Sequence, residues 1–238
     1  MTQSLSTMRR FLAVTLAWTV AIFLPMVVLE FLSDPVELAQ YSRWLGRALG
    51  LAAFPAGIAA SRSLGPPGRA WRVVLGMAAA AVVVALAVFV LMAWLPAVLG
   101  DENRSLSRLA LTMRTSGGSW ETLNDASWRY YEALLSPIQA LLYAAIGFQL
   151  GIWGPRAVTP ALSRVLYWGV GLGLVIVNFG VADTTYETII LRTAADVRFA
   201  AAYAFLLPAG IAAGLSLPTL AVLRRSEFTG APGGDDSH

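Results

Sequence analysis

The sequence of 238 residues contains no cysteine, and its only histidine is His238 at the C-terminal end. Without cysteine there is no disulfide, no iron–sulfur cluster and no thiolate metal site. All 17 basic residues are arginine, so the chain lacks the lysine of a P-loop and of a Schiff base. No histidine before His238 offers a buried imidazole for haem or zinc, or a partner for a catalytic serine. We therefore predict that the protein is not an enzyme and has no cofactor and no metal site.

Charge is also scarce: only 13% of the residues are charged and 57% are hydrophobic. Soluble domains carry about 25% charged residues, and the mean hydropathy of +0.65 is well above what they show. The composition therefore predicts a polytopic membrane protein. The arginines are dispersed between apolar segments, so nucleic-acid binding is not expected.

Long stretches without charge predict the membrane spans, because a spanning helix needs about 20 apolar residues. Five stretches meet this requirement, and the sixth does so if it starts near Trp44 and Arg47 snorkels to the membrane interface. The predicted fold is an all-α transmembrane bundle over residues 1–225, followed by a disordered cytoplasmic tail over 226–238. The predicted spans are residues 11–32, 44–61, 73–99, 133–154, 165–182 and 199–223.

The placement of arginine predicts the orientation of the bundle. With the N-terminus in the cytoplasm, the short inside segments carry arginines beside the helix ends and no acid before Glu227. The outside segments carry eleven acids by our count of the sequence, several of them in the longest loop, residues 101–132. We expect this loop to lie against the outer interface through its aromatic residues, and both chain ends to be cytoplasmic.

Four of the six spans contain a Gly-x-x-x-Gly pair, which lets helices approach closely. The glycines are Gly46 and Gly50, Gly147 and Gly151, Gly169 and Gly173, and Gly210 and Gly214. Two interpretations remain open: ordinary packing within the bundle, or a face that binds a partner chain.

Polar residues within the spans are few, and none of them is ionisable: Thr15, Thr19, Gln139, Gln149, Asn178 and Ser216. Proton coupling and ion conduction normally need buried charges, so neither is expected. At the outer end, Glu30 can pair with Arg43 or Arg47. Alternatively, these two arginines bind the phosphate of an anionic lipid head group.

Several short strings resemble the lipopolysaccharide-export permeases, the LptF/LptG family. They are Arg9-Arg10 before the first span, Phe54-Pro55 in the second, Trp94-Leu95-Pro96 with Asp101-Glu102-Asn103-Arg104 after the third, residues 130–137 before the fourth, Leu206-Leu207-Pro208 in the last, and residues 223–226 at its end. The resemblance implies a multi-pass protein of the bacterial inner membrane that handles a lipid, with an ATPase as a possible partner.

The chain departs from that family at two places. Residues 101–132 stand where the family has a periplasmic jellyroll, and the short turn at residues 61–72 stands where it has a cytoplasmic coupling helix. Two functions are therefore carried forward. The first is a permease-like subunit that handles a lipid or another amphiphile, with Arg43 and Arg47 at the head group and spans one and five at a lateral opening. The second is a non-catalytic accessory subunit that binds other membrane proteins through its glycine faces and its aromatic loop.

Overall fold

The computed structural model describes residues 2–31, 38–64, 70–98, 120–177 and 194–228, and regular structure in these ranges is helical without any strand. The helices are α1 (Thr2–Phe31), α2 (Leu38–Ser61), α3 (Ala70–Phe89), the π-helical turn η1 (Val90–Trp94), α4 (Leu95–Val98), α6 (Trp120–Ala157), α7 (Pro160–Val175) and α9 (Ala194–Phe228).

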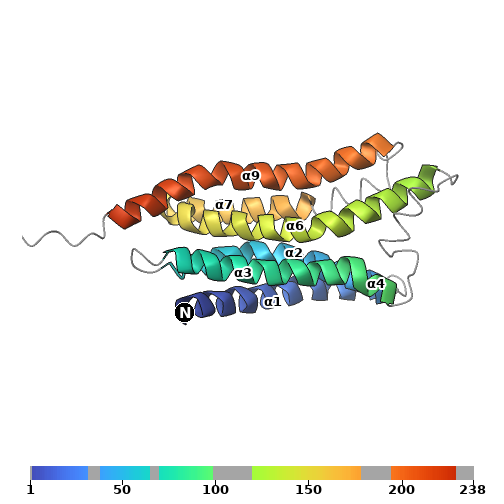
Figure 1. Cartoon of the computed structure of the whole chain (residues 1–238), viewed down its shortest axis with the longest axis horizontal. Coiled ribbons are helices and arrows are strands. Elements are labelled where there is room, and N and C mark those ends of the chain that lie inside the picture. Colours follow the sequence, from blue (N-terminus) through green and yellow to red (C-terminus); the bar gives the residue numbers. More distant parts are fainter. Residues whose placement is uncertain (1, 32–37, 65–69, 99–119, 178–193, 229–238) are drawn as a thin grey trace, which may run out of the picture.

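The helices lie side by side along the long axis of the molecule, with α3, η1 and α4 forming one continuous rod (Figure 1). Consecutive rods run in opposite directions, so α1, α3 and α7 share one direction and α2, α6 and α9 share the other (Figure 1). As a result, the start of α1 and the end of α9 lie at the same end of the bundle.

Four helical segments are long and apolar enough to cross a membrane: Gln3–Val28, Ala70–Trp94, Ala133–Pro155 and Phe205–Leu223. They correspond to the first, third, fourth and sixth predicted spans, which supports a membrane protein that is helical over its described residues. The second predicted span is helical as part of α2, but Arg47 lowers its hydropathy. The fifth corresponds to α7, a shorter apolar helix, and residues 178–182 of that prediction lie outside the described residues.

Most helices begin before the predicted spans, and two of them reach into the segments predicted as the outside loop and the tail. Helix α6 starts at Trp120, within the predicted outside loop, because no glycine or proline interrupts the sequence before Pro137. Helix α9 continues to Phe228, past the predicted start of the tail, and the first glycine after it is Gly230. The predicted outside loop over residues 101–119 and the rest of the tail lie outside the described residues.

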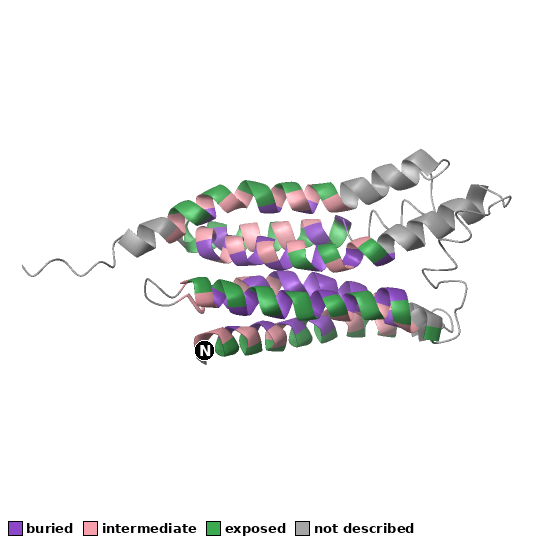
Figure 2. Ribbon diagram, in the orientation of Figure 1, coloured by how far each residue is buried: buried purple, intermediate pink, exposed green. Residues whose placement is uncertain are grey.

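Helix α2 lies at the centre of the bundle and is buried on nearly all sides, whereas α1 and α9 show most of their surface (Figure 2). Helix α2 packs most extensively against α6 and also contacts α1, α3 and α7. Large apolar side chains on the outer helices are exposed, for example Leu16 at 63% and Leu217 at 76%. A surface of this kind is unfavourable in water and favourable in lipid, which supports a membrane environment.

The π-helical turn interrupts the rod of α3 next to the second helix. Pro96 follows it by two residues and has no backbone N–H to donate to the carbonyl of Met92. The chain widens locally instead, and the N–H of Leu95 donates to the carbonyl of Val90, five residues earlier. Met92 is buried on the bundle side of this turn.

Candidate functional site

The candidate site is a set of buried polar side chains on α2 and α6, the two helices that pack most extensively, and we call it the buried polar cluster. Its members are Ser42 and Arg47 of α2 and Ser136, Gln139 and Tyr143 of α6, and all five are buried. Each of them takes part in a polar, charged or ring interaction. A buried arginine in an apolar bundle is costly unless it is compensated, so its presence within a membrane protein indicates a functional site.

Helix packing places Arg47 of α2 close to the depth of Ser136 and Gln139 of α6. Helices α2 and α6 run parallel, and a Cβ on Gly50 would lie 3.9 Å from the Cβ of Ala140. Arg47 is three residues before Gly50, and Ser136 and Gln139 lie within four residues before Ala140. Arg47, Ser136 and Gln139 therefore occupy neighbouring turns of the two packed helices.

Arg47 lies on the face of α2 that meets both α6 and α7. It precedes Phe54 by seven residues, which is about two helical turns, so the two residues share one face. The Phe54 backbone packs against Gly147 of α6, and a Cβ on Gly171 of α7 would lie 3.2 Å from the Phe54 ring. We expected Arg47 to snorkel to the membrane interface, but its side chain is only 5% exposed. The tertiary structure encloses it because α2 is the central helix.

Arg43 lies one turn before Arg47 and is half-buried. The Glu30 side chain lies outside the described residues, so its pairing with either arginine remains a prediction. Sequence reasoning selected the two arginines and Gln139 but missed Ser42, Ser136 and Tyr143. A usable signal was present, since residues 136, 139 and 143 follow the helical spacing of a single face.

The polar residues predicted within the other spans mainly hydrogen-bond to the helix backbone. The Thr15 hydroxyl donates to the Phe11 carbonyl, and the Thr19 hydroxyl donates to the Thr15 carbonyl. Between helices, the Gln149 side-chain amide donates to the Ser216 hydroxyl over 3.1 Å. Asn178 lies outside the described residues.

The predicted glycine pairs differ in what surrounds them. Gly147 and Gly151 of α6 lie directly against α2, where an added Cβ would overlap the Phe54 carbonyl oxygen and the Ser61 hydroxyl. Gly46 lies against Met92, whose Cγ and Sδ would be 2.8 Å from an added Cβ. Gly50 has room, with its nearest neighbours at 3.9 and 4.0 Å.

The other two pairs make no such approach. An added Cβ at Gly169, Gly173, Gly210 or Gly214 would meet nothing within 4 Å, so these glycines do not pack against another helix that the structure describes. Their role as a face for a partner chain remains a prediction.

Two further glycines lie directly against the backbone of another helix, and the Gly-x-x-x-Gly search missed both. Gly57 lies against the Ala144 carbonyl of α6, and Gly76 lies against the Ser4 carbonyl of α1. In both cases the residue four positions later, Ser61 or Ala80, is small but is not glycine. A search for any two small residues at this spacing finds both.

No protein-family model, no curated protein and no solved structure matches this chain. The resemblance to lipopolysaccharide-export permeases therefore rests on the short sequence strings given above. The chemistry of the cluster provides a separate argument. A guanidinium binds a carboxylate or phosphate through two parallel hydrogen bonds, and hydroxyl and amide groups add further donors. Among the residues that the structure describes, no group of three or more histidine or acidic side chains could hold a metal ion.

Proposed function

We propose that the chain is a permease-like subunit of the bacterial inner membrane that handles a lipid or another amphiphile, with six spans and both ends in the cytoplasm. The observation that carries the proposal is Arg47 of α2, which is only 5% exposed and lies close to the depth of the buried Ser136 and Gln139 of α6. Such a site suits an anionic group that must leave water, because the guanidinium replaces the hydration of that group.

The arrangement of α1 and α7 gives further support. These two helices are not among the pairs that pack extensively, and each packs against α2. They meet through the rings of Trp18 and Trp168, whose centroids are 6.3 Å apart in an edge-to-face contact. A small contact of this kind suits a lateral opening, since separating the two rings exposes little packed surface.

The six-span topology rests on the alternation of helix direction together with the placement of arginine. Rods that alternate in direction from α1 to α9 bring both described ends to one side (Figure 1). Arg62, Arg72 and Arg164 lie at helix ends on that side, which favours the cytoplasm.

A second candidate function is an accessory subunit without transport activity. The observation that favours it is the two glycine pairs on α7 and α9, where an added Cβ would meet nothing within 4 Å among the described residues. Small residues on an outer face permit close approach of a partner helix. In this case the buried polar cluster would fix the packing of α2 on α6 and bind no ligand.

A pull-down in mild detergent distinguishes the two functions. Recovery of an ATPase supports the permease-like subunit, whereas a large membrane complex without an ATPase supports the accessory subunit. The lipid fraction retained by the purified protein tests the cluster directly. We expect Arg47→Gln to retain about 10- to 100-fold less of the anionic amphiphile, the loss typical of one charged hydrogen-bonding pair.

Two matched variants complete this test. Arg47→Lys keeps the positive charge but cannot form a bidentate pair of hydrogen bonds, so we expect it to retain an intermediate amount of the amphiphile. Arg114→Gln removes the same charge from a segment outside the cluster and should retain the wild-type amount. Equal retention by the wild type and Arg47→Gln, with both folded, contradicts the ligand-binding role of the cluster.

A further inference from the structure

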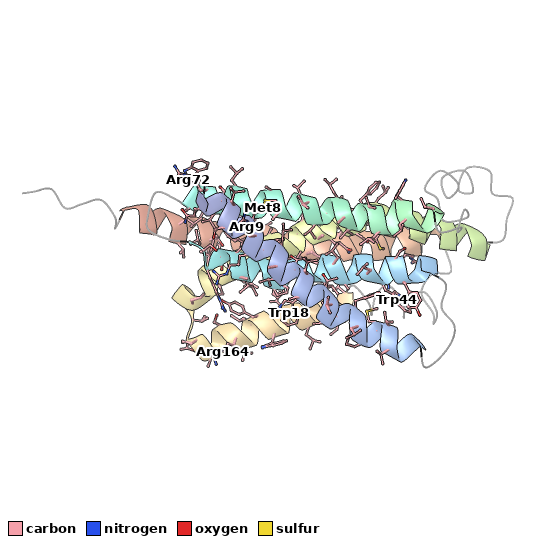
Figure 3. All side chains as sticks on the ribbon, turned by 90° about the horizontal axis from the view of Figure 1, so that it is seen from below. Met8, Arg9, Trp18, Trp44, Arg72 and Arg164 are labelled. Atoms are coloured by element: carbon pink, nitrogen blue, oxygen red, sulfur yellow. The ribbon has the colours of Figure 1, made fainter. Side chains whose placement is uncertain are left out.

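A second group of arginines gathers at the end of the bundle opposite the buried polar cluster, and we call it the basic collar. It consists of Arg9 and Arg10 of α1, Arg62 after α2, Arg72 of α3 and Arg164 of α7. Four of these side chains are exposed, and that of Arg72 is half-buried. Arg9, Arg72 and Arg164 lie toward the same end of the bundle, away from Trp44 (Figure 3).

Close contacts hold the first three helices together at this end. The Gln3 side-chain amide donates to the Ser63 carbonyl over 3.3 Å, which joins the start of α1 to the end of α2. The Ser4 backbone lies against Gly76, which joins α1 to the start of α3. Arg62 is next to Ser63, and Arg72 is about one turn before Gly76. These contacts therefore place both arginines at this end of the bundle.

Two contacts with α6 bring α7 to the same end. Ser61 at the end of α2 lies against Gly151, and one turn later Gly154 lies against Ser163, whose hydroxyl would be 2.8 Å from an added Cβ. Arg62 and Arg164 directly follow the two serines in the sequence. The packing of these small residues therefore places Arg62 and Arg164 at the same end of the bundle.

Nothing among the described side chains neutralises the collar. No described side chain is a carboxylate, so these five arginines form no ion pair within that part of the protein. Arg72 has an aromatic neighbour, since its guanidinium lies 5.5 Å from the centre of the Trp71 ring. Trp71 and Trp168 are themselves 61% and 68% exposed, as is typical of tryptophans at the head-group level of a bilayer.

We propose that the basic collar binds anionic phospholipids of the leaflet that surrounds it, through their phosphate-bearing head groups. Guanidinium groups bind phosphate oxygens in pairs of hydrogen bonds, and exposed apolar side chains such as Leu75 and Val165 are available to the acyl chains. We propose a bilayer lipid rather than free phosphate because the positive charge lies beside exposed tryptophan and aliphatic side chains, which free phosphate would not contact. The proposal is independent of transport, because the buried polar cluster lies at the other end.

The test uses the full chain purified in mixed micelles that contain phosphatidylglycerol or phosphatidylcholine. Native mass spectrometry measures how much of each lipid the protein retains, and the ratio of the two is the readout. We expect the wild type to prefer phosphatidylglycerol. Each arginine near a membrane surface accounts for about a fivefold preference, so Arg62→Gln with Arg164→Gln should lower the ratio roughly 25-fold.

The control is the double variant Arg108→Gln with Arg114→Gln, which removes the same charge from the segment between α4 and α6. Both described ends of that segment lie at the opposite end of the bundle (Figure 1), so the wild-type ratio should remain. Because the readout compares two lipids on one protein, a general loss of stability does not change it. If the collar double variant fails to fold, Arg62→Gln and Arg164→Gln alone should each show the fivefold step.

Three results would overturn the proposal. They are equal retention of the two lipids by the wild type, an unchanged ratio in the collar variants, and thermal stabilisation by inorganic phosphate equal to that by phosphatidylglycerol. The last result would assign the collar to a free anion rather than to a lipid.

Discussion

Replacing Gly147 with alanine tests whether the contact between α2 and α6 holds the bundle together. An added Cβ at Gly147 would overlap the carbonyl oxygen of Phe54 and lie 2.9 Å from its carbonyl carbon. Real Cβ atoms do not approach other atoms so closely, and the neighbour is backbone rather than the flexible end of a side chain. The two helices must therefore move apart over the packed region around this contact.

The magnitude follows from two opposing effects. Overpacking of a well-packed interior costs about 1–3 kcal/mol, and a rigid backbone neighbour favours the upper half of that range. Alanine is a better helix former than glycine by about 1 kcal/mol, which offsets part of the cost. The net loss is about 1–2 kcal/mol, which corresponds to a fall in Tm of roughly 2–8 °C for a chain of this size.

Gly173→Ala is the matched control, because an added Cβ at Gly173 meets nothing within 4 Å. Here only the gain in helix propensity remains, so Tm should stay the same or rise. Thermal unfolding in detergent can be followed by the fluorescence of the eight tryptophans. If both variants shift Tm by the same amount and in the same direction, the α2–α6 contact is not limiting for stability and the reasoning fails.

Three further predictions concern topology and packing. A cysteine at Ser116 should be labelled from the outer face of intact cells and a cysteine at Ser63 only after permeabilisation, and the reverse pattern would place the N-terminus outside. Gly173→Leu should leave the free energy of unfolding of the isolated chain within about 1 kcal/mol of wild type, so a change in the size of a co-purified complex would identify a partner on α7. Gln149→Leu removes the hydrogen bond to Ser216 together with a buried amide oxygen that has no hydrogen-bond partner, and should change stability by less than about 1 kcal/mol; a larger loss in thermal unfolding would contradict this.

Sequence reasoning succeeded where the signal is local. Charge-free length predicted four helical segments that can cross a membrane, because hydropathy along a single helix determines whether it is stable in lipid. It was less successful for helix ends. The start of α6 at Trp120 follows from an uninterrupted helical sequence, which the aromatic pattern of the loop concealed.

The candidate site was only partly predictable. Arg43 and Arg47 stood out because charges are rare within spans, but the sequence placed Arg47 at an interface rather than inside the bundle. Its burial depends on α2 being the central helix, with α6 and α7 on one face and α3 on another. The order of helices along the chain does not reveal which of them is surrounded by the others.

The sequence by itself determined that this is an all-helical membrane protein with arginine as its only basic side chain besides His238. Only the tertiary structure decided which small residues pack, so that Gly57, Gly76 and Gly147 meet another helix while Gly173 and Gly214 meet none of the described helices. The physical reason lies in the solvent. Lipid tails are as apolar as a helix–helix interface, so the faces of a spanning helix toward lipid and toward protein have similar composition. Hydropathy therefore identifies the helices but not their neighbours, and the neighbours are fixed by the fit of side chains and backbone between packed helices.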